Sequence, residues 1–244
     1  MLSRPNRRTG TKLSRHVSVH AYGRHPSQVG ELFEPDGPAV GVAVFLHGGF
    51  WRAPYDRHLM DDLCRDLAAG RWLAWNLEYR RLGEGGGWPQ TFEDVASGIA
   101  NGPASDGPTV AIGHSAGGHL ALWAAAQGLV THAVSQAGVV DLHAADRLAL
   151  SRNAARELLG RAPDEDPERW RTASPAALVP LGAPQLIVHG DDDDTVPASM
   201  SSSYAARDPN VELRLLPGVG HYEHLDPRST AWATVREFLE GLVR

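Results

Sequence analysis

Cysteine is almost absent from the sequence. The 244-residue chain has one, Cys64, and therefore cannot form an internal disulfide. Nothing in the cysteine content indicates an oxidising compartment. Cys64 lies in the amphipathic stretch LMDDLCRDLAAG, which predicts a buried thiol on a helix rather than a nucleophile.

Long apolar runs are also missing. The longest, such as AVGVAVFL, fall well short of the ~18 apolar residues that a membrane-spanning helix needs. The N-terminal stretch MLSRPNRRTGTKLSRH is basic but has no apolar segment typical of a secretory signal. We therefore expect a cytoplasmic protein without a membrane partner, in which residues 1–13 form a flexible basic leader.

The chain has no excess of positive charge. It carries 23 Lys and Arg against 29 Asp and Glu, a net charge of -6, which argues against a nucleic-acid partner. Its hydrophobic fraction of 42% and charged fraction of 21% are ordinary for a globular protein. We assign residues 14–244 to a single α/β domain; the sequence gives no indication of the oligomeric state.

Buried-strand patterns alternate with helix patterns along most of the chain. The strand patterns include AVGVAVFL, WLAWNLEYR, PTVAIGHS, THAVSQAGV and PQLIVHG. This alternation predicts a mostly parallel sheet with helices on both faces. Two extended segments near the N-terminus, RHVSVHAYG and VGELFEP, have no helix between them and predict an antiparallel start. Residues 141–182 break the pattern, and we interpret them as a small lid over the carboxyl edge of the sheet.

The pentapeptide GHSAG, residues 113–117, fits the G-x-S-x-G pattern of a nucleophile elbow. It stands between a predicted strand and a predicted helix, where small residues let the two elements approach closely. Ser115 would then be the nucleophile, and the backbone N–H of Ala116 would face the same space. The alternative is a serine that only caps the helix.

A serine nucleophile needs a base and an orienting acid, and in proteins that carry such an elbow both follow the serine in the chain. The stretch HGDDDDTVP offers four aspartates. Its resemblance to the H-G-x-x-D-x-x-V-P arrangement frequent in those proteins favours Asp193; Asp191, Asp192 and Asp194 stay as alternatives. Gly-His in PGVGHYEH favours His221 as the base. We expect His224 to be a surface histidine, since a zinc pair of His221 and His224 lacks further ligands at suitable spacing.

The loop FLHGGFW follows the predicted third strand, where this kind of site places a second oxyanion donor. The N–H of Gly49 or Phe50 could serve as that donor. We expect His47 to brace the loop by hydrogen bonds. Trp51 is a candidate wall of the acyl pocket, with ordinary core packing as the alternative.

With these motifs in order, the sequence resembles the α/β-hydrolase superfamily from about residue 14 to the end. The HGGFW loop resembles the H-G-G-x-W loop of the kynurenine formamidase (arylformamidase) branch. It is also similar to the H-G-G-G loop of hormone-sensitive-lipase-type esterases, but Phe50 replaces the third glycine. The resemblance implies an eight-stranded fold that requires no metal or organic cofactor. It implies a nucleophile, an acid, a base and three oxyanion donors at Ser115, Asp193, His221, Gly49, Phe50 and Ala116.

Three functions are compatible with these residues. The first is a serine hydrolase of small carboxylic esters, and the second is an arylformamidase that acts on N-formylkynurenine. Both take a small-molecule substrate and share one acyl-enzyme mechanism. The third is a non-catalytic ligand-binding protein on the same scaffold. Trp170 and Leu159 are candidate substrate contacts in the lid only because of their position.

Overall fold

The computed structural model describes residues 17–243, so the predicted leader, residues 1–13, lies outside the described residues. The strands are β1 (Val17–Ala21), β2 (Val29–Phe33), β3 (Val42–Leu46), β4 (Leu73–Leu77), β5 (Thr109–His114), β6 (His132–Gln136), β7 (Gln185–Gly190) and β8 (Val211–Leu216). The α-helices are α1 (Asp61–Ala69), α2 (Gln90–Ala100), α3 (Ala116–Ala126), α4 (Leu142–Arg147), α5 (Ala154–Leu159), α6 (Pro167–Ala173), α7 (Pro175–Leu178), α8 (Ala198–Ala205) and α9 (Thr230–Gly241). Two short 3-10 helices are η1 (Arg57–Met60) and η2 (Glu223–Leu225).

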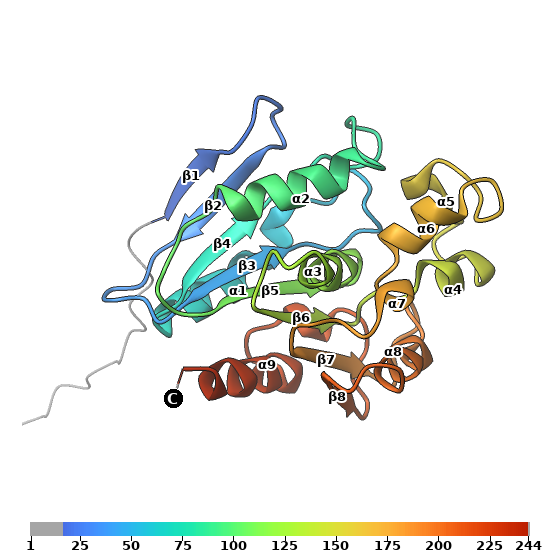
Figure 1. Cartoon of the computed structure of the whole chain (residues 1–244). Helices are drawn as coiled ribbons and strands as arrows, with labels where there is room; N and C mark the ends of the chain where they lie inside the picture. The colour runs from blue at the N-terminus through green and yellow to red at the C-terminus, as the bar shows by residue number, and fades with distance from the viewer. Residues whose placement is uncertain (1–16, 244) are drawn as a thin grey trace, which may run out of the picture.

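All eight strands form one sheet in the order β1-β2-β4-β3-β5-β6-β7-β8. The pairs β1–β2 and β2–β4 are antiparallel, and every later pair is parallel. The predicted antiparallel start and parallel remainder are therefore both confirmed. Parallel strands require crossover connections, and helices supply them here (Figure 1).

Two hydrophobic layers sandwich the sheet. Along β3, Val42, Val44 and Leu46 belong to one buried cluster, whereas Ala43 and Phe45 belong to the other. The first cluster includes side chains of α2, α3 and α8, and the second includes side chains of α1 and α9. Both faces of β3 are therefore buried, which explains why its sequence is apolar throughout and does not alternate with polar residues.

The segment between β6 and β7 holds the four short helices α4 to α7, which lie together at one side of the molecule (Figure 1). The Asp141 carboxylate accepts a hydrogen bond from the Ala144 N–H and begins α4. Trp170 and Leu159, the two candidate lid contacts, are both buried in the core. Their apolar side chains attach these short helices to the rest of the molecule and are not exposed to a substrate.

The loops that carry the predicted site residues all leave carboxyl ends of parallel strands. The H-G-G loop follows β3, Ser115 follows β5, Asp193 follows β7 and His221 follows β8. Because β3, β5, β6, β7 and β8 are neighbours in the sheet, their carboxyl ends meet at one edge. This is the edge at which open α/β sheets bind ligands.

Candidate active site

Ser115 occupies a strained turn between β5 and α3. Its backbone angles are φ 55° and ψ −117°, a region that non-glycine residues rarely adopt. A Cβ at Gly113 would lie 2.0 Å from the Gly117 oxygen, and one at Gly117 would lie 1.9 Å from the Leu46 oxygen. Only glycine fits at both positions. The flanking glycines therefore make possible the close strand–helix contact that holds Ser115 in this conformation.

Gly49 and Phe50 of the loop after β3 line the same pocket as Ser115, and Ala116 directly follows Ser115 at the start of α3. Gly49 and Phe50 have left-handed φ angles of 104° and 49°. Within residues 17–243, the N–H groups of Gly49, Phe50 and Ala116 have no hydrogen-bond acceptor. The Ser115 Oγ is likewise buried and without a partner there. Unpaired donors at a helix N-terminus can stabilise an oxyanion.

His47 braces this loop, as predicted. Its Nδ1 donates to the Gly48 oxygen at 2.8 Å, and its Nε2 lies 2.9 Å from Glu78 Oε1. The Glu78 carboxylate also accepts the Arg57 and Tyr79 N–H groups. Burial raises the pKa of Glu78, but the hydrogen bond from His47 and the other donors lower it more, so the net shift is downward. The sequence patterns did not single out Glu78, although it stands directly after the apolar run that forms β4.

Asp193 and His221 are in direct contact. His221 Nδ1 donates to Asp193 Oδ2 at 2.7 Å, and both side chains are buried. Asp193 Oδ1 accepts the N–H groups of Thr195 and Val196 at 2.9 and 2.8 Å, so the carboxylate is held at both ends. The structure thus brings together the aspartate and histidine that the sequence favours.

The other aspartates of the loop have different partners. Asp191 Oδ1 accepts the Gly218 N–H at 2.7 Å, and Asp194 Oδ1 accepts the Thr195 hydroxyl at 3.1 Å. The side chain of Asp192 makes no hydrogen bond within the part of the chain that the structure describes. These residues tighten or flank the turn and do not reach His221.

A second histidine supports Asp193 from beneath. His189 Nε2 donates to Asp193 Oδ2 at 3.1 Å and to the Val196 oxygen at 3.0 Å, while its Nδ1 accepts from the Ser201 hydroxyl. Burial raises the pKa of Asp193, but the hydrogen bonds from His189 and His221 outweigh it and hold the pKa far below its usual value. Asp193 is therefore ionised and can stabilise an imidazolium on His221.

Two further buried histidines pack around His221. The His114 ring lies 4.7 Å from the His221 ring, and its Nε2 donates to the His221 oxygen at 2.8 Å. His224 is 0% exposed, so its prediction as a surface histidine was wrong. Burial, then neighbouring histidines, lower the pKa of both His114 and His224 to about 3. Both rings are neutral and pack as part of the core.

A pocket of about 180 Å³ opens at the Ser115 side chain, which lines it together with His221, Gly49 and Phe50. Its other walls include Tyr55, Leu59, Ser151, Tyr222 and Leu225. Trp51 does not line it: the indole is 0% exposed and meets His119 edge-to-face at 5.2 Å. The prediction of Trp51 as a substrate contact was wrong, because the indole packs in the hydrophobic core instead.

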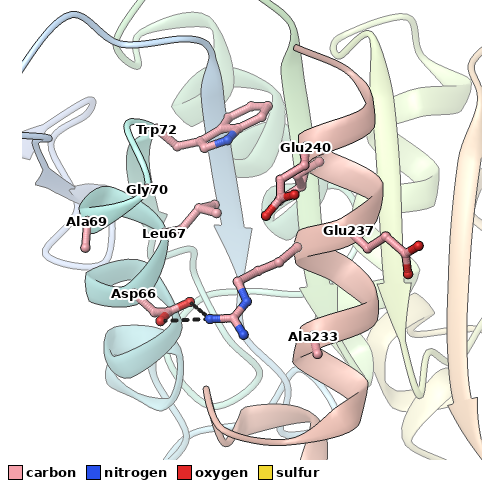
Figure 2. Close-up of a pocket in the computed structure, with 10 residues that line it drawn as sticks. Asp66, Leu67, Ala69, Gly70, Trp72, Ala233, Glu237 and Glu240 are labelled. Atoms are coloured by element: carbon pink, nitrogen blue, oxygen red, sulfur yellow. Dashed lines mark hydrogen bonds and ion pairs between the residues drawn. The ribbon is translucent and has the colours of Figure 1, made fainter. Parts of the chain in front are cut away.

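A larger hollow lies between α1 and α9, on the opposite helix layer from α3 (Figure 2). Its central charge, Asp66, accepts hydrogen bonds from the Trp232 indole at 2.6 Å and from Arg236 at 3.2 Å. Asp66 and Arg236 therefore neutralise each other at its centre. The hollow is far from the strand ends that carry Ser115, and it has no nucleophile beside a base.

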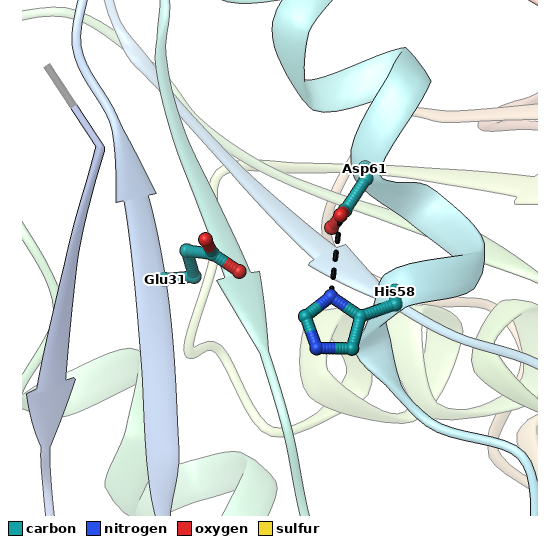
Figure 3. Close-up of side chains that lie close together, drawn as sticks. All are labelled: Glu31, His58 and Asp61. Carbon is teal, nitrogen blue, oxygen red and sulfur yellow. Dashed lines mark hydrogen bonds and ion pairs between the residues drawn. The ribbon is translucent and has the colours of Figure 1, made fainter.

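Glu31, His58 and Asp61 bring their side chains together near the start of α1 (Figure 3). His58 Nδ1 lies 3.2 Å from Asp61 Oδ2. Arg57 lies 3.5 Å from Glu31, and Arg65 lies 3.3 Å from Asp61. Because a guanidinium already faces each carboxylate, we interpret the cluster as an ion-pair network.

Over the described residues, no helix is both long and apolar enough to cross a membrane.

A protein family and an individual known protein match this sequence. A family model described as BD-FAE matches residues 33–207. The esterase LipC of Mycobacterium tuberculosis is 28% identical over 245 residues, which cover 86% of this chain. This chain spans only 60% of the length of that relative.

Solved structures give the same fold. A truncated form of a carbohydrate esterase from gut microbiota superposes with a TM-score of 0.77 at 19% identity, covering 94% of this chain and 98% of that one. Esterase 2 of Thermogutta terrifontis superposes with a TM-score of 0.72 at 21% identity, covering 93% of this chain and 91% of that one. These likenesses confirm the predicted α/β-hydrolase fold.

Proposed function

Because the chain belongs to the BD-FAE family of α/β-hydrolase-fold esterases, we propose that it is a serine hydrolase that cleaves small carboxylic esters. The observation that carries the proposal is the convergence at one pocket of Ser115, the His221–Asp193 pair and unpaired backbone N–H groups. A serine that only caps a helix would not need an ionised, doubly supported aspartate behind a histidine. The LipC relative is itself named an esterase.

Acylation uses each of these groups. His221 takes the Ser115 proton as Oγ attacks the ester carbonyl, and Asp193 holds the imidazole with Nδ1–H toward itself. The negative charge that develops on the carbonyl oxygen meets the N–H groups of Ala116 and of Gly49 or Phe50. His221 then gives its proton to the leaving alcohol, and the acyl group stays on Ser115.

Deacylation repeats the same proton transfers with water. His221 removes a proton from water, the hydroxide attacks the acyl carbonyl, and the same N–H groups stabilise the second oxyanion. Collapse returns the proton from His221 to Ser115 Oγ and releases the carboxylic acid. No step calls for a metal or an organic cofactor.

The size of the pocket supports a small substrate. Its volume of about 180 Å³ lies below the roughly 300–1,000 Å³ of pockets that enclose drug-sized ligands. Aromatic and aliphatic side chains, among them Phe50, Tyr55, Leu59 and Tyr222, form much of its lining. Such a site suits a short acyl group or a compact alcohol better than a long chain.

The finer resemblance to the formamidase branch stays a prediction. The HGGFW loop motivates it, but the matched relatives are named esterases. A formamide would use the same nucleophile, base and oxyanion donors, so the site geometry alone does not separate an amine from an alcohol leaving group. Cytoplasmic location and the lack of a membrane or nucleic-acid partner also remain predictions from the sequence.

The direct test compares two substrates on one preparation. We expect measurable kcat/KM for p-nitrophenyl acetate and a much lower value for N-formyl-L-kynurenine. Ser115→Ala should lower ester turnover by several orders of magnitude and leave the fold intact, because only the oxyanion donors and binding remain. Preference for the formamide would replace the ester proposal, and near-native turnover by Ser115→Ala would refute the nucleophile.

A further inference from the structure

One edge of the proposed ester pocket is an unusual piece of backbone. Ser151, which lines the pocket, lies in the connection between α4 and α5. Within residues 149–153, four non-glycine residues have left-handed φ angles: Ala149 (50°), Ser151 (44°), Arg152 (57°) and Asn153 (60°). Side chains disfavour this conformation, so it persists only where surrounding contacts impose it.

Arg52, in the loop that follows β3, supplies such contacts. Its NH1 donates to both the backbone oxygen and the hydroxyl of Ser151, each at 2.9 Å. Its Nε donates to Glu157 Oε2 on α5 at 2.6 Å. A single guanidinium therefore holds the strained connection and the following helix at once, which its planar fork allows and a lysine ammonium would not.

The backbone of Arg52 is itself fixed to the oxyanion loop. Its N–H donates to the Gly49 oxygen at 3.0 Å, and it forms an isolated parallel bridge with Leu82. Gly49 carries one of the proposed oxyanion donors and stands only three positions earlier. The Arg52 side chain thus connects Ser151 to the loop that binds the reacting carbonyl.

We propose that Arg52 is a positioning residue that locks the 149–153 connection against the active-site pocket and so limits the size of the ester that reaches Ser115. This inference rests on the proposed ester hydrolysis. Ser151 sets the boundary of the pocket, and Arg52 keeps that boundary in place. Removing the guanidinium releases the left-handed backbone toward ordinary conformations, and the pocket widens beside Ser151.

The test measures selectivity with three esters: phenyl acetate, phenyl octanoate with a larger acyl group, and 4-biphenylyl acetate with a larger alcohol. In Arg52→Ala, we expect kcat/KM for at least one bulky ester to rise about tenfold relative to phenyl acetate, the size of effect that pocket shape produces. The gain should come from a lower KM for the bulky ester. The kcat for phenyl acetate should stay within about threefold of wild type, because the oxyanion donors are backbone groups.

Two further variants separate the lock from general damage. Glu157→Gln removes the negative charge that faces Arg52 at a half-exposed position and should shift selectivity in the same direction by less. Arg171→Ala breaks an exposed ion pair with Glu168 within α6 that involves neither the pocket nor the 149–153 connection, and should leave the selectivity ratio unchanged. Hydrogen exchange of residues 149–157 should speed up in Arg52→Ala and not in Arg171→Ala.

Three outcomes overturn the inference. One is an Arg52→Ala variant whose kcat falls by the same factor for all three esters, which would make Arg52 a support of the oxyanion loop alone. The second is an unchanged selectivity ratio in Arg52→Ala, and the third is the same change of ratio in Arg171→Ala. If wild type hydrolyses none of the esters, the proposed function fails; the exchange measurement then still reports whether Arg52 holds the connection.

Discussion

At the scale of single residues, the two carboxylate oxygens of Asp193 have different partners and different roles. One carboxylate oxygen accepts from His221 and His189, and the other accepts two backbone N–H groups. The two backbone N–H groups hold the carboxylate in place. The hydrogen bond from His221 Nδ1–H keeps His221 in the tautomer that leaves Nε2 free to accept a proton. An aspartate that only capped the turn would need the backbone contacts alone.

Replacing Asp193 tests this division. In Asp193→Asn, the amide oxygen can keep the backbone contacts, while the amide NH₂ group cannot accept the hydrogen bond that His221 Nδ1–H donates. We expect kcat to fall by about 10⁴-fold, the loss seen when a triad histidine is held in the wrong tautomer. Steady-state kinetics with p-nitrophenyl acetate measures it. Asp192→Asn is the matched control in the same loop, and equal losses in the two variants would refute the assignment.

Residues adjacent to a motif were less predictable than the motif itself. Ser115, Asp193 and His221 follow from pattern and order because the chemistry requires those residue types after those strands. Trp51 and His224 stand next to such motifs, yet both side chains point into the core. Their direction depends on a left-handed turn and on a short 3-10 helix, and single-sequence patterns do not specify either.

At the scale of elements, the end of β4 supports the loop after β3. The Glu78 carboxylate accepts from His47, whose other nitrogen donates to the Gly48 oxygen directly before Gly49. The two strands are parallel neighbours, so their carboxyl ends lie side by side. The brace therefore connects one strand end to the oxyanion donors of the next.

Breaking this brace should weaken catalysis more than binding. In Glu78→Gln, the amide has one oxygen acceptor in place of two, so either His47 or a backbone N–H loses its partner. We expect kcat to fall about tenfold to a hundredfold, less than removal of an oxyanion donor itself, with KM little changed. Glu84→Gln, at an exposed partner of Arg81, is the control. A rise in KM at constant kcat would place the brace in substrate binding instead.

The elements of the sheet were predictable and those of the lid less so. The inner strands β3, β4, β5 and β7 are short, largely apolar runs. Helices α1, α2 and α9 bury an apolar stripe, whereas α3 is buried on nearly all sides. Helix α4, by contrast, has only six residues, too few for a periodic pattern to stand out. It forms because Asp141 caps it and because Leu142 and Ala145 are buried against the core.

At the scale of the whole molecule, buried neutral histidines make folding sensitive to acid. Burial lowers the pKa of His114 and His224 to about 3 and that of His119 to about 4. In the unfolded chain the same groups take up a proton near the ordinary value of 6.5. Stability is therefore fully present above pH 6.5 and is lost as the pH falls toward the folded-state pKa values.

His224→Phe should make the protein less sensitive to acid. His224 has no hydrogen-bond partner on either ring nitrogen among the described residues, so an apolar ring of similar size can replace it. One such histidine contributes up to about 2 kcal/mol of the loss between pH 8 and pH 5. Urea unfolding at pH 8 and pH 5 measures the difference, and an equal decrease in wild type and variant would contradict the account.

The topology as a whole followed from the alternation of strands and helices, since parallel strands need crossover helices and place their carboxyl ends at one edge. The walls of the pocket did not follow. Tyr55, Ser151 and Tyr222 meet there from loops that are far apart in sequence, and their convergence depends on loop conformations. Chemistry was therefore more predictable than specificity.

The most direct test of the central claim is the mass of the protein after reaction with an aryl phosphonate ester. Nucleophilic attack by Ser115 predicts one phosphonyl group per chain, located on the peptide that contains Ser115, with loss of ester hydrolysis in proportion. Ser115→Ala should gain no mass under the same conditions. An adduct on another residue, or equal labelling of Ser115→Ala, would contradict the account.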